Sequence, residues 1–520
     1  MDKLFNLYSK KVVRGSDEFE MFQTFFNGDR KRAEQWLDSH MKTLQTKNDK
    51  KADQLRIQGN KFYMKKNFKE SIETYTKALC NAEHEKETYS VILSNRSAAF
   101  YMTNDFKNCL KDINYCIKCN CPENILLKIY IRRVKCYAKM DLKEQLNNAV
   151  MEALEFADRC PGVTDKDLVR KDIFTSSIEK AQVDQMKYES IEGLPKLKDS
   201  NNNSFLYASS AIRLDYDEQR GRYVKANKKL NSGDIIFIEK PLIFAPVFIN
   251  EYMDLPFDKC YNCLKTTLSC IPCQSCIRCV FCDEDCRDNC WDEFHKWECV
   301  GMQADLWYNI GIAFPAFRAL LKGAKSGFNT LDTDYKTDTV CFGNKCNNYP
   351  YFNKLVSNIS KMKNILPFII SATVIILYLK KKTEFFNWLT EQPKFLEENV
   401  DDLIIHLGGL LTRHIAQFQC NSSTIFHKNL NSYDDTPVAC AIYPSVSMMN
   451  HSCKPNIAIY YIRDIVIVEA AEEIKTNEEI CNCYGIDYRY DDWKSRQEHL
   501  RNQYYFDCRC RACKEHFEDK

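Results

Sequence analysis

The sequence predicts a multidomain α+β protein. Helical repeats come first, a β-rich part with a metal-binding segment and a helical insert follows, and a cysteine-rich tail ends the chain. Three observations support this prediction: a repeated pattern of small and aromatic residues after residue 51, a run of paired cysteines at 260–299, and a Cys-x-Cys-x-x-Cys tail at 508–513. The 520 residues are enough for two or three domains.

The composition is that of an ordinary globular protein, with 45% hydrophobic and 28% charged residues. A net charge of +2 argues against direct nucleic-acid binding, so we expect protein partners. The first twenty residues lack the apolar core of a signal peptide, and the 27 cysteines are therefore expected to be metal ligands and buried thiols in a cytoplasmic and nuclear protein. The apolar run 365–379 contains Pro367 and is shorter than the ~20 residues of a membrane span, which predicts a buried helix and no membrane association.

Residues 1–50 are expected to be helical, and a repeat follows at 51–160. Small and aromatic residues recur in it, with Phe68, Phe106 and Leu142 spaced 38 and 36 residues apart. This pattern is typical of tetratricopeptide-like (TPR-like) helix pairs, which stack into a solenoid and bind a peptide or a partner protein. The alternative is an ordinary helical bundle. Residues 161–205 are expected to form a helix and a polar linker, which ends in Lys196–Ser204.

Eight potential ligands between residues 260 and 299 form four close pairs. The pairs are Cys260/Cys263, Cys273/Cys276, Cys282/Cys286 and His295/Cys299. Ligands separated by two or three intervening residues allow one tight turn to present both to a tetrahedral ion, so eight ligands predict two structural zinc ions. Disulfides or a patch of free thiols are the alternative. Cys270, Cys279 and Cys290 are left over.

A second set of cysteines joins two distant segments. The tail supplies three thiols, Cys508, Cys510 and Cys513, and lacks a fourth ligand. Cys453, in the polar sequence Asn450-His451-Ser452-Cys453, is the natural donor, and it would fix the tail beside this turn. Along the chain we expect strands at 223–227 and 235–239, joined by a hairpin-like turn, and a further strand at 465–469.

These motifs together resemble a known family. The 260–299 run resembles the MYND zinc finger, and residues 206–513 resemble the SET- and MYND-domain lysine methyltransferases (SMYD), of the branch with N-terminal TPR repeats. The resemblance implies interleaved zinc pairs, with Cys260, Cys263, Cys282 and Cys286 on one ion and Cys273, Cys276, His295 and Cys299 on the other. It also implies a SET N-terminal part at 206–255, the MYND finger at 256–299, a helical insert at 300–420, the SET core at 421–486 and a post-SET zinc tail at 487–520.

The resemblance further implies S-adenosylmethionine-dependent methylation of a lysine on a histone or non-histone protein, with a role in chromatin regulation. It assigns cofactor binding to Arg220, Gly221, Arg222, Asn421, Ser447, Asn450, His451, Tyr484 and Phe506, and catalysis to Tyr484 and Tyr504. Ser447 is expected in the strand that leads to Asn450. Methyl transfer needs aligned reactants, exclusion of water from the site and a neutral amine. Tyrosine hydroxyls can orient this amine without adding charge.

The chain departs from the family pattern where the usual Gly-x-Gly loop has Tyr223 in place of the second glycine. An aromatic residue there prevents the close backbone approach that glycine permits, which predicts weaker binding of the cofactor. The alternative function is therefore a zinc-stabilised adaptor without turnover, in which the repeats and the MYND surface recruit partners such as transcriptional corepressors.

Overall fold

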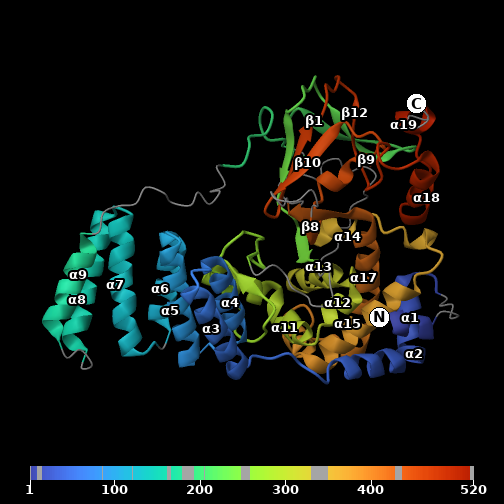
Figure 1. The fold of residues 1–520 in the computed structure, drawn as a ribbon. Coiled ribbons are helices and arrows are strands. Elements are labelled where there is room, and N and C mark those ends of the chain that lie inside the picture. The colour runs from blue at the N-terminus through green and yellow to red at the C-terminus, as the bar shows by residue number, and fades with distance from the viewer. Residues whose placement is uncertain are drawn as a thin grey trace. The chain divides into compact units, whose positions relative to one another are not determined.

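The computed structural model describes residues 2–8, 15–84, 86–119, 121–160, 165–178, 193–203, 205–247, 258–328, 349–427 and 436–515 (Figure 1). The chain forms two compact units, each built from separate segments. Unit 1 comprises Met1–Thr43, Gly193–Met253 and Lys296–Lys520, and unit 2 comprises Leu44–Glu192 and Asp254–His295. The multidomain α+β class is confirmed. Much of the predicted linker region 161–205 lies outside the described residues.

Unit 2 begins with three helical hairpins and a closing helix. The helices are α3 (Asp49–Met64), α4 (Phe68–Asn81), α5 (Glu87–Met102), α6 (Phe106–Lys118), α7 (Glu123–Lys139), α8 (Lys143–Arg159) and α9 (Lys166–Ser177). Each hairpin turn contains one left-handed residue, Lys66, Asn104 or Asp141, at matching positions. The second helix of each pair begins at or beside Phe68, Phe106 or Leu142, so the predicted period corresponds to real TPR-like helix pairs.

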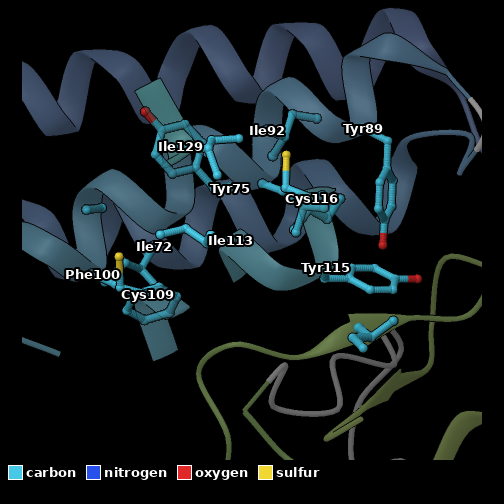
Figure 2. Packing of buried hydrophobic residues seen from close by; sticks show 14 of the residues in the cluster. Ile72, Tyr75, Tyr89, Ile92, Phe100, Cys109, Ile113, Tyr115, Cys116 and Ile129 are labelled. Atoms are coloured by element: carbon cyan, nitrogen blue, oxygen red, sulfur yellow. The ribbon is translucent and has the colours of Figure 1, made fainter. Parts of the chain in front are cut away.

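Small side chains allow these helices to pack closely. A Cβ atom on Gly59 would lie 2.5 Å from the Tyr75 ring, so α3 and α4 meet where only glycine fits. Figure 2 shows Ile92 and Cys116 together in the core between α5 and α6. The buried cysteines of this core, such as Cys116, pack as small hydrophobic residues, as expected.

The zinc-finger segment up to His295 belongs to unit 2. It contains β5 (Ile271–Pro272), β6 (Val280–Phe281), α10 (Glu284–Cys290) and the π-helical turn η1 (Trp291–His295). The buried Arg96 of α5 forms a bidentate ion pair with Asp112 of α6. Its guanidinium also donates to the Cys270 carbonyl at 2.9 Å. Lys111 donates to the Ser269 carbonyl at 2.7 Å. The finger is therefore fixed to the repeats by buried, charge-assisted hydrogen bonds.

Three small sheets form the β-rich part of unit 1. The sheets run in the orders β1-β2-β12-β9, β10-β11-β3 and β4-β8-β7. Their strands are β1 (Ile212–Asp217), β2 (Gly221–Ala226), β3 (Ile235–Glu239), β4 (Ile243–Pro246), β7 (Ser422–His427), β8 (Thr436–Ile442), β9 (Asn450–His451), β10 (Ile457–Ile462), β11 (Ile465–Ala470) and β12 (Glu479–Asn482). The predicted strand at 465–469 is confirmed as β11. The predicted hairpin is wrong: β2 pairs with β1 and β12, whereas β3 pairs with β11, so the turn between them connects two sheets.

Helices complete unit 1. They are α1 (Asp2–Leu7), α2 (Glu18–His40), α11 (Lys296–Gln303), α12 (Leu306–Ile310), α13 (Ala313–Ser326), α14 (Tyr349–Asn353), α15 (Leu366–Lys382), α16 (Phe385–Thr390), α17 (Val400–Asn421), α18 (Trp493–Gln503) and α19 (Arg511–Lys514), with short 3-10 turns at η3 (Ile359–Lys361) and η4 (Val446–Met448). The apolar run forms α15 and is buried, as predicted. None of the described helices combines the length and apolar character that a membrane span needs.

The N-terminal helix α2 packs against α15 and α17 in unit 1 (Figure 1). A Cβ atom added to Gly408 would lie 2.0 Å from the Phe22 ring, so α17 approaches α2 at a glycine. Arg413 of α17 also pairs with Glu18 at the start of α2. The residues that precede the repeats are thus part of the same unit as the SET core.

Candidate cofactor site and metal centres

The structure brings the predicted metal ligands together in three groups. The groups are Cys260, Cys263, Cys282 and Cys286; Cys273, Cys276, His295 and Cys299; and Cys453, Cys508, Cys510 and Cys513, each with its ligand atoms within 4.8 Å of one another. The first two show the interleaving that the MYND resemblance implies.

The spacing of the donor atoms fits tetrahedral zinc. A Zn–S bond of about 2.3 Å places two sulfurs of a tetrahedron about 3.8 Å apart. The Sγ atoms of Cys263 and Cys282 are 3.8 Å apart, and those of Cys453 and Cys508 are 3.9 Å apart. In the second group, His295 presents Nε2, which lies 3.2 Å from Cys273 Sγ. Cys279 Sγ lies 4.0 Å from the other ring nitrogen and is outside the ligand group.

The tail centre lies beside the turn at Asn450–Cys453. His451 Nε2 is 3.3 Å from Cys453 Sγ, and His451 Nδ1 accepts a hydrogen bond from the Tyr484 backbone N–H at 3.0 Å. An accepting Nδ1 makes the imidazole neutral, with its proton on Nε2 facing the thiolate. Burial also lowers the pKa of His451 to about 4. The ring therefore positions the Tyr484 backbone, and we do not expect it to act as an acid or base.

A cavity of about 1410 Å³ in unit 1 lies next to this centre. All ten residues predicted for cofactor binding and catalysis line it: Arg220, Gly221, Arg222, Asn421, Ser447, Asn450, His451, Tyr484, Tyr504 and Phe506. They come from the β1–β2 turn, the end of α17, η4, β9, the segment after β12, and the tail. Ser447 lies in the 3-10 turn η4 and not in a strand as expected, because its hydroxyl and N–H both bond back to the Tyr443 carbonyl.

Sequence reasoning missed Glu479 at the start of β12. Its carboxylate accepts from Asn450 Nδ2 at 3.1 Å and from Arg220 Nη1 at 3.1 Å. It thereby connects β9 to the β1–β2 turn across the wall of the cavity. Asn456 has a related role, since its side chain donates to the Glu479 carbonyl and accepts from the Cys481 N–H, both at 2.9 Å. An acidic residue at the start of the strand before Tyr484 was the only available signal.

The aromatic departure at Tyr223 does not face the cavity. The Tyr223 side chain is buried, with the Arg220 guanidinium 3.9 Å from its ring centroid and donating to its hydroxyl at 3.0 Å. The Tyr223 ring thus stabilises the position of Arg220 in the β1–β2 turn by a cation–π contact. Gly221, with φ of +68°, takes the left-handed turn where glycine is favoured.

A second cavity of about 870 Å³ adjoins the first at the two tyrosines. Residues of β7 and β10 line it, and Tyr484 and Tyr504 line both cavities. Their ring centroids are 4.8 Å apart. The Tyr484 hydroxyl donates to the Met449 carbonyl at 2.8 Å, and the Tyr504 hydroxyl lies 3.4 Å from the Tyr484 carbonyl.

Burial keeps both of these hydroxyls protonated. It raises the pKa of Tyr504 to about 12 and that of Tyr484 well above its ordinary value. Two neutral phenols at the junction of two cavities can orient a small reacting group by hydrogen bonding without contributing charge.

Comparisons with known proteins agree with this geometry. The family model for the SET domain matches residues 221–485, which is 265 of the 520 residues. The chain is 24% identical to the human protein-lysine N-methyltransferase SMYD4 over 88% of its own length and 66% of that protein. It is 23% identical to the Danio rerio SMYD4 (90% and 66%) and 26% identical to the Danio rerio N-lysine methyltransferase SMYD2-A (58% and 59%).

The chain spans about 66% of the length of these SMYD4 relatives. It carries the SET match, the interleaved finger ligands and the cysteine tail on one polypeptide. The chain belongs to the SET-domain family, in the branch that combines SET and MYND domains.

Proposed function

We propose that this protein is a protein-lysine N-methyltransferase, which transfers a methyl group from S-adenosylmethionine to a lysine of a histone or non-histone protein. One observation supports the proposal most strongly: two cavities meet at Tyr484 and Tyr504, and the larger contains every residue that the family resemblance assigns to the cofactor. The names of the SMYD4 and SMYD2 relatives support the same activity.

The residues of the larger cavity fit the parts of this cofactor. Arg222 offers cationic donors for a carboxylate, the Asn450 amide offers polar contacts, and the Phe506 ring offers a flat apolar surface for adenine. When bound, S-adenosylmethionine supplies a methyl group on a positively charged sulfur. The three donor groups would hold structural zinc, and the tail ion would keep Phe506 at the cavity.

The two tyrosines would orient the lysine amine at the cavity junction. The Tyr484 hydroxyl directs its proton to the Met449 carbonyl, so its oxygen lone pairs are available to an amine N–H. A free lysine amine has a pKa of about 10.4 and must lose a proton before it attacks. Burial away from water would lower the pKa of the amine, as would the positive charge of a bound S-adenosylmethionine, and neutral phenols add no negative charge that would oppose this. The protein thus contributes alignment of the reacting groups and exclusion of water.

The repeats and the finger would bind peptide or protein partners, in the cytoplasm and the nucleus, consistent with roles in chromatin regulation. The adaptor alternative gains no support, because Tyr223, the residue that suggests weak cofactor binding, packs against Arg220 and is not among the residues that line the cavity.

The proposal is tested by incubating the full chain with cell extract and isotope-labelled S-adenosylmethionine, and identifying labelled lysines by mass spectrometry. We expect Tyr484→Phe to abolish labelling while S-adenosylmethionine binding and zinc content stay near those of the parent. Tyr490→Phe is the matched control, because Tyr490 is 82% exposed. Equal labelling by Tyr484→Phe and the parent contradicts the catalytic assignment.

A further inference from the structure

A chain of buried polar side chains in unit 1 is not used by the proposed methyl transfer. It runs from Tyr349 on α14 to His414 and Gln417, which lie three residues apart on α17. All three side chains are buried, and none of them lines either cavity. Burying polar groups costs free energy unless they are hydrogen-bonded, so the bonding partners of these residues indicate their role.

The hydrogen bonds of this chain have one consistent direction. The Gln417 amide nitrogen lies 2.9–3.0 Å from three backbone carbonyl oxygens, so this end of the amide is the donor. The amide oxygen lies 2.9 Å from His414 Nδ1 and must accept, which places the imidazole proton on Nδ1. The Tyr349 hydroxyl then donates to His414 Nε2 at 2.9 Å. Burial lowers the pKa of His414 to about 3, which keeps the ring neutral and the direction fixed.

The three carbonyls belong to the end of α14 and the turn after it. They are those of Phe352, Asn353 and Leu355. The last carbonyls of a helix have no partner within the helix, so a buried helix end needs donors from elsewhere. Gln417 supplies them, with two N–H groups shared among the three oxygens. The Leu355 N–H also donates to the Phe352 carbonyl at 2.9 Å, so the turn after α14 is closed.

The chain that follows α14 forms part of the wall of the larger cavity. In this wall segment, residues 353–358, the side chains of Leu355, Val356 and Asn358 line the larger cavity but not the smaller one. After Asn353 the wall segment forms neither helix nor strand. Its position therefore depends on the side-chain donors of α17.

Asn421, one turn after Gln417, extends this attachment. Its amide nitrogen donates to the Val356 carbonyl at 2.8 Å and to the Gln417 carbonyl at 2.7 Å. Both amide hydrogens of Asn421 are thus directed at the backbone, and its oxygen is the atom that remains for a ligand. The end of α17 therefore holds the wall segment at two successive points, Gln417 and Asn421.

We propose that Gln417 is a positioning residue for the cofactor, which holds the wall segment at the larger cavity, and that His414 orients the Gln417 amide for this role. The inference rests on the proposed function, because it takes S-adenosylmethionine as the ligand of this cavity. A wall that is fixed before the ligand arrives lowers the entropic cost of binding. Because the wall segment borders only the larger cavity, loss of Gln417 is expected to affect the cofactor and to leave the lysine site intact.

The test is titration calorimetry of the full, zinc-loaded chain with S-adenosylmethionine. Gln417→Met keeps an unbranched side chain of similar length and removes its hydrogen bonds. We expect its dissociation constant to rise at least about tenfold, because three buried carbonyls lose their donor. Thr412→Val is the matched control on the same helix: Thr412 is also buried, and its hydroxyl donates to the Gly408 carbonyl within α17. This control is expected to change the affinity less than about twofold.

Further readouts separate positioning from a general loss of stability. In Gln417→Met, backbone amides of the wall segment are expected to exchange faster with solvent, whereas those of β9 keep parental protection. In the labelling assay, saturating S-adenosylmethionine is expected to restore the parental rate, so KM for the cofactor changes and kcat does not.

Two variants of His414 test its part. His414→Asn retains an amide donor in the place of Nδ1 and is expected to bind S-adenosylmethionine within about twofold of the parent. His414→Phe keeps an aromatic ring without a donor and is expected to bind at least about fivefold more weakly. If Gln417→Met fails to fold, this pair of variants decides the question.

The outcomes distinguish this inference from the proposed function. If the parent does not bind S-adenosylmethionine, the proposed function fails and the inference fails with it. If the parent binds and Gln417→Met binds equally well, or if Gln417→Met and Thr412→Val lose the same affinity, the positioning role alone is refuted. Equal affinities of His414→Asn and His414→Phe refute the role of His414.

Discussion

The cysteine tail gives a prediction that connects metal binding to cofactor binding. Cys510→Ser replaces one thiolate of the Cys453–Cys513 group with a poor zinc ligand. Residues 506–511 and Lys514 line the larger cavity, so release of the tail removes part of that wall. His451 loses its fixed thiolate neighbour 3.3 Å away at the same time.

The expected magnitude follows from the contact that is lost. Burying an aromatic side chain against an apolar partner stabilises by about 1.5–3 kcal/mol. Loss of the Phe506 contact alone therefore predicts a rise of about 10- to 150-fold in the dissociation constant for S-adenosylmethionine. The backbone hydrogen bond from Tyr484 to His451 becomes less well positioned, which adds to this loss.

The assay combines elemental analysis with isothermal titration calorimetry. The parent is expected to hold three zinc ions and Cys510→Ser two, with the affinity loss given above. Cys440→Ser makes the same chemical change in β8, outside all three ligand groups, and is expected to keep three ions and parental affinity. If Cys510→Ser holds two ions and still binds the cofactor as tightly as the parent, the tail does not form the cavity wall.

Two further predictions concern buried charges. Burial raises the pKa of Glu239 to about 7 from 4.5, although its carboxylate accepts from the Ser445 and Val446 N–H groups, so the folded state holds its proton more strongly than the unfolded state. Protonated Glu239 contributes fully to stability below pH ~4.5, and this contribution of about 3 kcal/mol is lost as the pH rises through ~7. Urea unfolding at pH 5 and pH 8 should therefore show that the free energy of unfolding of Glu239→Gln increases by about this amount relative to the parent at the higher pH. A difference between variant and parent that is the same at both pH values refutes this. Asp112→Ala leaves the Arg96 guanidinium buried without its partner and is expected to destabilise unit 2 by about 3–5 kcal/mol. Hydrogen exchange in α5 and α6 measures this loss, and Asp158→Ala, which breaks the exposed pair with Arg170, is expected to cost at most about 1 kcal/mol; equal protection in the two variants would contradict the role of the buried pair.

The sequence predicted best what depends on short spacing. Zinc ligands must come in close pairs, so Cys260/Cys263 and the tail thiols could be found by counting. The apolar run that forms α15 and the period of the helix pairs are also local patterns. The residues of the larger cavity came from family resemblance, and the structure brings all of them to one place.

The parts that were missed depend on contacts between distant segments. The turn before Ile235 has hairpin chemistry, but strand pairing is decided by the partners β11 and β12, which lie more than 200 residues later. The position of α2 depends on Gly408, where α17 leaves room for an aromatic ring. The attachment of the finger to the repeats depends on Arg96 reaching the Cys270 carbonyl, 174 residues away. No local pattern encodes such contacts.

The central claim is that the cavity between β9, the β1–β2 turn and the tail binds S-adenosylmethionine. Titration calorimetry of the full, zinc-loaded chain tests it most directly. The account predicts one S-adenosylmethionine per chain and an affinity at least about tenfold lower for Asn450→Ala, which removes the amide that faces Glu479 and the cavity. Absence of binding by the parent, or unchanged affinity in Asn450→Ala, would contradict it.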